Sequence, residues 1–120
     1  MPEIQVFGRN DSPDTRAAQR FFRERRIVVT FVDLGKRPIA LGELRRFSDR
    51  LGAAALLDTT PRRHEEASIA SLRMDDAAIV VRLLADPRLL RLPLVRHGSA
   101  VTVGRAEAIW TSWLRPAAGR

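Results

Sequence analysis

Apolar and polar positions in the first third of the chain follow two different periods. Residues 3 to 8 and the run I-V-V-T-F-V-D-L at 27 to 34 are short, apolar and rich in β-branched residues, which predicts two strands, the second of them buried. Residues 13 to 26 have helical periodicity instead. The apolar face of this predicted helix consists of Ala17, Phe21 and Phe22. Because the crossover between the strands is helical, we expect the two strands to be parallel.

The next predicted helix spans residues 41 to 52, after the turn sequence G-K-R-P. Its inner face is expected to contain Leu41, Leu44, Phe47, Ser48 and Leu51. Gly52 is placed to end it. A strongly apolar helix follows at 75 to 85, where Asp75 and Asp76 suit the positive end of the helix dipole and Pro87 prevents continuation.

The final third of the chain predicts a hairpin and one more helix. Two short strands at 92 to 96 and 100 to 103 enclose His97-Gly98-Ser99, which supplies the turn, so His97 is expected to be exposed. A helix from 105 to about 115 follows. The residues expected to face the sheet from this helix are Ala106, Ile109, Trp110 and Trp113.

The segment from 53 to 71 has the weakest pattern. The stretch D-T-T-P-R-R-H-E-E favours a loop that ends in a short helix, with Thr60 as a cap and Pro61 just inside it. His64 is interpreted as a solvated loop residue, although Glu65 and Glu66 beside it are a weak alternative cation site.

Taken together, the elements follow the order β-α-β, helical insert, β-β-α. This order predicts an α/β fold with a mixed four-stranded sheet flanked by helices, in a single domain covering residues 1 to 120, a length that suits one modest core. The chain has no apolar run of eighteen residues, and its first residues lack the pattern of a signal peptide. We therefore expect a cytoplasmic protein with no membrane association.

The absence of cysteine excludes disulfides, thiolate metal sites and redox chemistry by the chain's own thiol. Two histidines are too few for a zinc site without carboxylate ligands, so no metal site is predicted.

The formal net charge of +7 raises the question of nucleic-acid binding. Lys36 is the only lysine among the 21 basic residues, and the arginines are spread from Arg9 to Arg120 near Asp and Glu rather than gathered around aromatic residues. This distribution favours a solvated arginine-rich surface, and nucleic acid is an unlikely partner.

The stretch N-D-S-P-D-T-R, which follows the first strand, has the features of a helix start. Ser12 is suited to the N-cap, Pro13 to the first helical position and Asp14 to the first turn. The free amides and the dipole at such an end favour anions, so we expect Pro13 and Asp14 to border an anion site with Arg16 and Arg105, forming a small positive concavity.

Three stretches carry a resemblance to a known family. They are V-F-G-R-N-D-S-P-D-T-R-A-A, V-D-L-G-K-R-P-I-A-L-G-E-L, and D-P-R-L-L-R-L-P-L-V with V-G-R shortly after it. In this order, over roughly residues 3 to 114, the sequence resembles the arsenate reductase-like group that includes the Spx-type transcription regulators. The resemblance implies a thioredoxin-like fold with a cis peptide bond before Pro93, facing the site.

The resemblance also implies site residues. The family's nucleophilic cysteine corresponds to Ser12, and the second cysteine of Spx-type members corresponds to Thr15. Arg16 matches a basic residue after the motif, and Arg105 matches one oxyanion-binding arginine of arsenate reductases. A second such arginine falls at Leu92, with Arg91 one place early, and the third falls near Asp58, where Arg62 or Arg63 is an alternative.

The function implied is thiol- or selenol-dependent reduction with glutathione or a small protein thiol as co-substrate, inactive in this form because Ser12 cannot cycle through a disulfide. Three explanations of Ser12 stay open: a natural cap in a member that lost its chemistry, a replacement of cysteine or selenocysteine, or a domain that never had redox activity. The alternative function is a non-enzymatic Spx-like module that docks on RNA polymerase or another protein through the helical insert.

Overall fold

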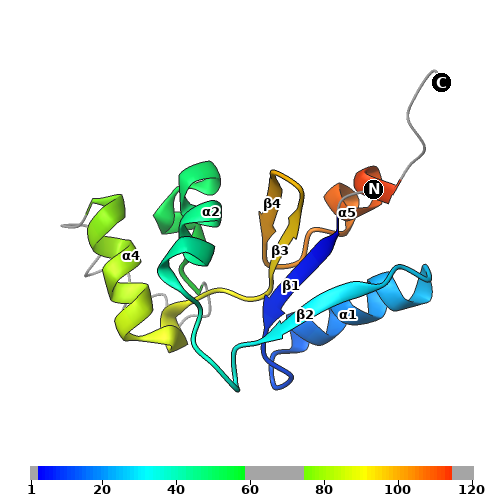
Figure 1. Cartoon of the computed structure of the whole chain (residues 1–120), viewed down its shortest axis with the longest axis horizontal. Helices are drawn as coiled ribbons and strands as arrows, with labels where there is room; N and C mark the ends of the chain where they lie inside the picture. Colours follow the sequence, from blue (N-terminus) through cyan, green and yellow to red (C-terminus); the bar gives the residue numbers. More distant parts are fainter. Residues whose placement is uncertain (1–2, 59–74, 115–120) are drawn as a thin grey trace.

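The computed structural model describes residues 3–58 and 75–114 (Figure 1). Its strands are β1 (Ile4–Gly8), β2 (Val29–Asp33), β3 (Leu94–His97) and β4 (Ala100–Val103). Its α-helices are α1 (Pro13–Glu24), α2 (Leu41–Leu51), α4 (Asp76–Ala85) and α5 (Glu107–Leu114), and its 3-10 helices are η1 (Ala53–Leu56) and η2 (Pro87–Leu89). The loop and short helix predicted around Thr60 and Pro61, and the expectations for His64, Arg62 and Arg63, lie outside the described residues.

The four strands form one mixed sheet in the order β2-β1-β3-β4. The pairing of β1 with β2 is parallel, with Val6 opposite Phe31, whereas β3 is antiparallel to both β1 and β4, with Val95 opposite Val6 and Thr102. The predicted α/β fold, the parallel first pair and the antiparallel hairpin are therefore confirmed. The bond between Leu92 and Pro93 is cis, as predicted.

The prediction that residues 27 to 34 form a buried strand is wrong in its burial. Among the described strands, β2 lies at the edge of the sheet and pairs with β1 alone, and its residues are half-buried or exposed. Val28, just before it, is 91% exposed. At the edge of a sheet, a strand has a neighbouring strand on one side and solvent on the other. The apolar sequence of β2 therefore did not lead to its full burial.

The first helix ends two residues earlier than predicted because the chain reverses after it. Arg26 has a φ of 59°, in the left-handed region, and its amide donates to the Arg23 carbonyl at 3.0 Å. The Ile27 amide donates to the Phe22 carbonyl at 2.9 Å. These bonds occupy carbonyls at the helix end, which stops α1 at Glu24.

One face of the sheet is covered by α1 and α5 through an aromatic cluster. The cluster consists of Ile4, Val6, Ala18, Phe21, Phe22, Val95 and Trp110. The ring centroids of Phe21 and Phe22 both lie 5.4 Å from that of Trp110, whose Nε1 donates to the Thr102 hydroxyl at 2.9 Å. Ala18 rather than Ala17 is the buried alanine of α1, and Ile109, expected to face the sheet, is 50% exposed.

The opposite face carries an aliphatic cluster, to which β1 contributes Phe7 because successive side chains of a strand alternate between faces. The cluster consists of Phe7, Ile39, Leu44, Phe47, Ala53, Leu56, Leu57, Ile79, Val80, Leu83, Leu89, Leu90, Leu92 and Leu94. The helices α2 and α4 lie side by side here, at the left of Figure 1. Leu41, expected on the inner face of α2, is 42% exposed.

Caps and turns mostly agree with their sequence signals. Asp75 is the N-cap of α4 and accepts from the Ala78 amide at 2.8 Å, and Gly52 ends α2 with a φ of 82°.

His97 differs from its prediction. It is the last residue of β3 and half-buried, with its ring stacked at 5.4 Å on Trp113, because α5 covers this end of the hairpin.

None of the helices in the described ranges has the length and apolar character needed to cross a bilayer.

Candidate functional site

The start of α1 is built by the loop that leaves β1. The Ser12 amide donates to the Arg9 carbonyl at 3.0 Å, and the Ser12 hydroxyl accepts from the Thr15 amide at 3.2 Å. Pro13 occupies the first helical position, where its missing amide is not needed. Ser12 is therefore the N-cap that its sequence predicts, and its side chain is only half-buried.

Thr15 lies differently from Ser12. Its side chain is fully buried, and its Oγ1 has no hydrogen-bond partner among the described residues. It packs on the backbone of Gly8, so closely that a Cβ atom at Gly8 would lie 2.4 Å from Thr15 Oγ1. Of the two positions that correspond to cysteines in the resemblance, only Ser12 is partly open to solvent.

Ser12 borders a cavity of about 370 Å³ between the start of α1 and the segment that leads into β3. We call it the Ser12 cavity. Its charged residues are Arg9, Arg91, Asp11, Asp14 and Asp58, and its remaining walls are Ser12, Pro13, Leu90 and Leu92. Two guanidinium groups and three carboxylates give mixed charge, in place of the positive concavity expected from the sequence.

Backbone pairing brings the distant residues of the cavity together. The Arg91 amide donates to the Leu56 carbonyl at 2.7 Å, and the Asp58 amide donates to the Leu89 carbonyl at 2.8 Å. Leu57 and Leu90 form an isolated antiparallel bridge between these two bonds. The pairing aligns the chain after η1 with the chain after η2, so Asp58 and Arg91 both reach the Ser12 cavity.

The position of the Arg91 side chain depends on a glycine. Its guanidinium passes over Gly104, where a Cβ atom would lie 2.7 Å from both Nε and Nη2. Gly104 also has a φ of 72°, which side chains disfavour, and its amide donates to the Pro93 carbonyl at 2.9 Å. Arg91 precedes by one residue the position at which the family resemblance places an arginine, Leu92, and its side chain nevertheless reaches the cavity.

Arg16 and Arg105 do not line the Ser12 cavity, although the sequence grouped them with Ser12. Arg16 donates from Nη1 to the Asn10 carbonyl at 2.8 Å. Arg105 donates to Glu107 Oε2 at 2.5 Å and borders a different cavity, between α1 and α5. The ion pair between Arg105 and Glu107 raises the pKa of Arg105 and lowers the pKa of Glu107. The carboxylate of Glu107, two residues further along the chain, therefore holds the Arg105 guanidinium outside the Ser12 cavity.

Pro93 is buried and does not itself border the Ser12 cavity, but Leu92, on the other side of the cis bond, does. The chain around the cis bond therefore faces Ser12.

The model of the ArsC family matches residues 8–112, which include Ser12, Arg91, the cis Pro93 and Arg105. The chain belongs to the ArsC family.

This ArsC-family chain has relatives of nearly its own length. It is 28% identical over 108 residues to the arsenate reductases of two Neisseria meningitidis strains, of serogroups A and B, an alignment that covers 88% of the chain and 92% of each relative. Among solved structures, the YffB protein superposes with a TM-score of 0.80 at 23% identity, covering 93% of this chain and 99% of that one.

A second solved structure, the arsenate reductase from Vibrio cholerae, superposes with a TM-score of 0.78 at 16% identity, covering 94% of this chain and 98% of that one. At these identities the structures establish the fold. The predicted family and its thioredoxin-like fold are confirmed.

Sequence reasoning missed Arg9 and Asp11 as residues that line the Ser12 cavity. Arg9 donates from Nε to Asp11 Oδ1 at 3.1 Å. The sequence feature that could have identified Arg9 and Asp11 is their position between β1 and Ser12, in the loop that leads to the start of α1. Within residues 3–58 and 75–114, no three side chains of His, Cys, Asp or Glu are placed to hold a metal ion.

Proposed function

We propose that this ArsC-family chain binds a small thiol, glutathione or the thiol of a small protein, in the Ser12 cavity. The observation that carries the proposal is the placement of Ser12: it caps α1 beside the residue that precedes the cis Pro93, in a cavity of about 370 Å³. The positive end of the α1 dipole and the guanidinium groups of Arg9 and Arg91 are suited to the carboxylates of such a thiol.

We further propose that the chain does not perform thiol redox chemistry as long as serine occupies position 12. A thiol at a helix N-terminus can have its pKa lowered from about 8.5 to between about 3.5 and 7.5, so that the reactive thiolate is present at neutral pH. A serine hydroxyl becomes a nucleophile only beside a base such as histidine, and no histidine or lysine is among the described residues that line the Ser12 cavity.

With cysteine or selenocysteine at position 12, the cavity would support reduction by exchange. The chalcogenolate would attack one sulfur of a disulfide, release the other sulfur as a thiolate, and remain as a mixed disulfide that a second thiol then reduces. Thr15 is buried and has no sulfur, so the second thiol would come from glutathione or a partner protein. This step suits the reducing cytoplasm, which remains our proposed location.

The experiment compares the chain with its Ser12→Cys variant. The parent should bind glutathione in an NMR titration, with shifts at the amides of residues 12 to 16, but show no turnover with a glutathione-coupled disulfide substrate. Ser12→Cys should gain turnover, whereas Ser99→Cys, at an exposed serine of the hairpin turn, is the matched control and should not. Failure of glutathione to move the amides of residues 12 to 16 would remove the proposal.

A second candidate function is a non-enzymatic binding module, in the manner of Spx. The observation that favours it is a groove of about 620 Å³ between α2 and α4, where Leu41 is 42% and Val81 is 65% exposed. A protein partner, with RNA polymerase as the first to test, would dock on this helical insert. Binding of purified polymerase that is abolished by Val81→Asp, together with no turnover by Ser12→Cys, would favour the module.

A further inference from the structure

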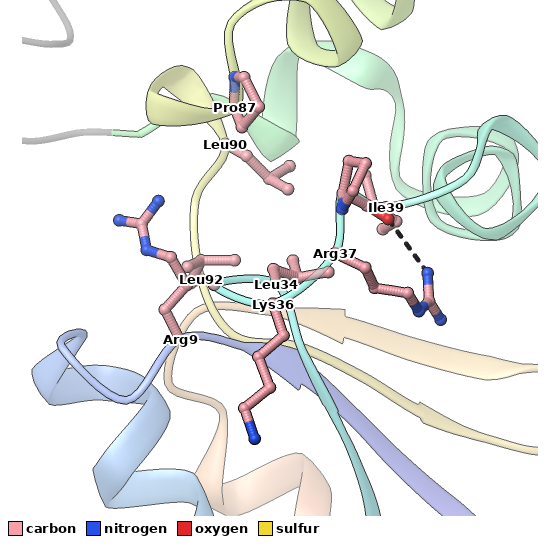
Figure 2. Close-up of a pocket in the computed structure, with 10 residues that line it drawn as sticks. Arg9, Leu34, Lys36, Arg37, Ile39, Pro87, Leu90 and Leu92 are labelled. Atoms are coloured by element: carbon pink, nitrogen blue, oxygen red, sulfur yellow. Dashed lines mark hydrogen bonds between the residues drawn. The ribbon is translucent and has the colours of Figure 1, made fainter.

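A second cavity adjoins the Ser12 cavity and differs from it in chemistry. It measures about 260 Å³ and lies between the loop after β2 and the segment around η2. Figure 2 shows Leu90 and Leu92 directed toward the space between these segments, with Leu34 and Ile39 on its other side and Pro87 above. We call it the apolar cavity.

The two cavities share part of their walls. Arg9, Leu90 and Leu92 border both of them. A ligand that occupies the Ser12 cavity therefore has an apolar compartment directly beside it. The apolar cavity alone is slightly smaller than the roughly 300–1,000 Å³ of most ligand pockets, so it suits one apolar group rather than a whole cofactor.

The loop that forms one wall of the apolar cavity is held by hydrogen bonds. The Leu34 amide donates to the Gly8 carbonyl at 2.8 Å, and the Lys36 amide donates to the Asp33 carbonyl at 3.0 Å. The Arg37 guanidinium binds both carboxylate oxygens of Glu43 at 2.9 Å. The cavity wall is thus formed before any ligand arrives, which lowers the entropy cost of binding.

The charged residues among the described lining of the apolar cavity are all cations. Its described lining includes Arg9, Lys36 and Arg37 but no aspartate or glutamate. Arg37 is engaged with Glu43, and Figure 2 shows Lys36 and Arg37 extending away from the leucine side chains. Arg9 is the cation that both cavities share.

The partner of Arg9 is easily replaced. Arg9 binds Asp11 at 3.1 Å, and the Asp11 side chain is 77% exposed, so this pair contributes little in water. A carboxylate of a ligand can take the place of Asp11 and gain the same charge-assisted hydrogen bond.

We propose that the apolar cavity binds the aliphatic or aryl group of a small amphipathic anion, whose carboxylate contacts Arg9 at the boundary with the Ser12 cavity. The proposal rests on the proposed function in one respect only, namely that the same ligand continues into the Ser12 cavity as a thiol or thioether. It identifies the preferred ligand of the Ser12 cavity as a thiol or thioether that carries an apolar substituent.

The first experiment uses hexanoate, butyrate and acetate as probes, with NMR detection of the methyl groups of Leu34, Ile39 and Leu90. Hexanoate should shift these methyls, and each added methylene should tighten binding by about threefold to fourfold. Binding that does not depend on chain length, or shifts that centre on Val81 in the groove between α2 and α4, would overturn the proposal.

Variants assign the binding to named residues. Leu34→Trp should fill the cavity and weaken hexanoate about tenfold, while Leu41→Trp, at an exposed leucine outside both cavities, is the matched control and should not. Arg9→Ala should weaken hexanoate about fivefold and Arg20→Ala, an arginine that borders neither cavity, should have no effect. Equal affinities in Leu34→Trp, Arg9→Ala and the parent would sink the proposal.

A last comparison separates the inference from the proposed function. S-hexylglutathione should bind the parent at least tenfold more tightly than glutathione does. In Leu34→Trp, the two compounds should bind with equal affinity. If hexanoate binds as expected and glutathione does not, the apolar cavity stands and the proposed function fails. A third outcome is that glutathione binds, but hexanoate binds no more tightly than acetate and S-hexylglutathione no more tightly than glutathione. The proposed function then stands, and the apolar cavity is not a ligand site.

Discussion

The two faces of the sheet are packed in different ways. On the face covered by α1 and α5, the Trp110 indole is fully buried between phenylalanines, and its only polar atom donates to Thr102. On the other face, the aliphatic cluster is buried at its centre, but its margin at Leu90 and Leu92 opens into both cavities. The closed face supports the sheet, and the open margin leaves room for a ligand.

This difference has a geometric origin. Helices α1 and α5 pack directly on the sheet through large aromatic rings, and the cavity between these two helices is lined mostly by polar side chains. On the other face, the loop after β2 and the segment around η2 meet beside the sheet, and their proline and leucine side chains do not fill the space where the loops meet. Loops beside a rigid sheet are common positions for binding residues.

The largest expected effect tests the closed face. Trp110→Ala should lower the free energy of unfolding by about 3–5 kcal/mol, because it removes a buried ring and leaves a cavity, whereas Leu90→Ala, beside an existing cavity, should cost about 2 kcal/mol. Urea denaturation followed by circular dichroism measures both. Equal losses for the two variants would break the contrast between the faces.

The next effect tests the contact beneath the start of α1. Gly8→Ala should lower the free energy of unfolding by about 1–3 kcal/mol, because the new methyl group would overlap the Thr15 side chain at 2.4 Å. The double variant with Thr15→Ala should recover part of this loss, and the coupling from the full mutant cycle measures the contact. Simple additivity of the two changes would show that Thr15 does not pack on Gly8.

A smaller effect on stability, with a larger one on reactivity, tests the open margin. Ser12→Cys should change the free energy of unfolding by no more than about 1 kcal/mol, the value of a helix cap. The helix N-terminus should lower the pKa of the new thiol below about 8.5. The pH dependence of iodoacetamide alkylation measures this pKa, with Ser99→Cys as the control, and a midpoint at or above 8.5 would contradict the prediction.

The smallest effect concerns the loop that forms the wall of the apolar cavity. The bidentate bond from Arg37 lowers the pKa of Glu43 below its ordinary value of 4.5, so the ionised carboxylate stabilises the folded state above that pH, and this contribution is lost as the pH falls through the folded pKa. Glu43→Gln should therefore be less stable than the parent at pH 7 and equal to it near pH 2. Urea midpoints at the two pH values measure the gap, and a gap that persists at low pH would contradict this account.

Local patterns determined much of the fold and part of the site. The β-α-β order, the hairpin, the cap at Ser12 and the acidic helix start at Asp75 were predicted because each depends on residues close together in the sequence. The cis bond at Pro93 and the family were predicted from short motifs in order. These features need no knowledge of which distant elements become neighbours.

The tertiary structure alone decided which predicted residues meet. Thr15 is buried because Gly8 lies beneath it, while Leu41 and Ile109 are exposed because no described element covers them. Arg91 reaches the Ser12 cavity through the pairing of the chain after η1 with the chain after η2, whereas Arg105 binds its neighbour Glu107 outside that cavity. A side chain's burial and partners depend on distances between elements far apart in the sequence, and residue spacing along the chain does not contain those distances.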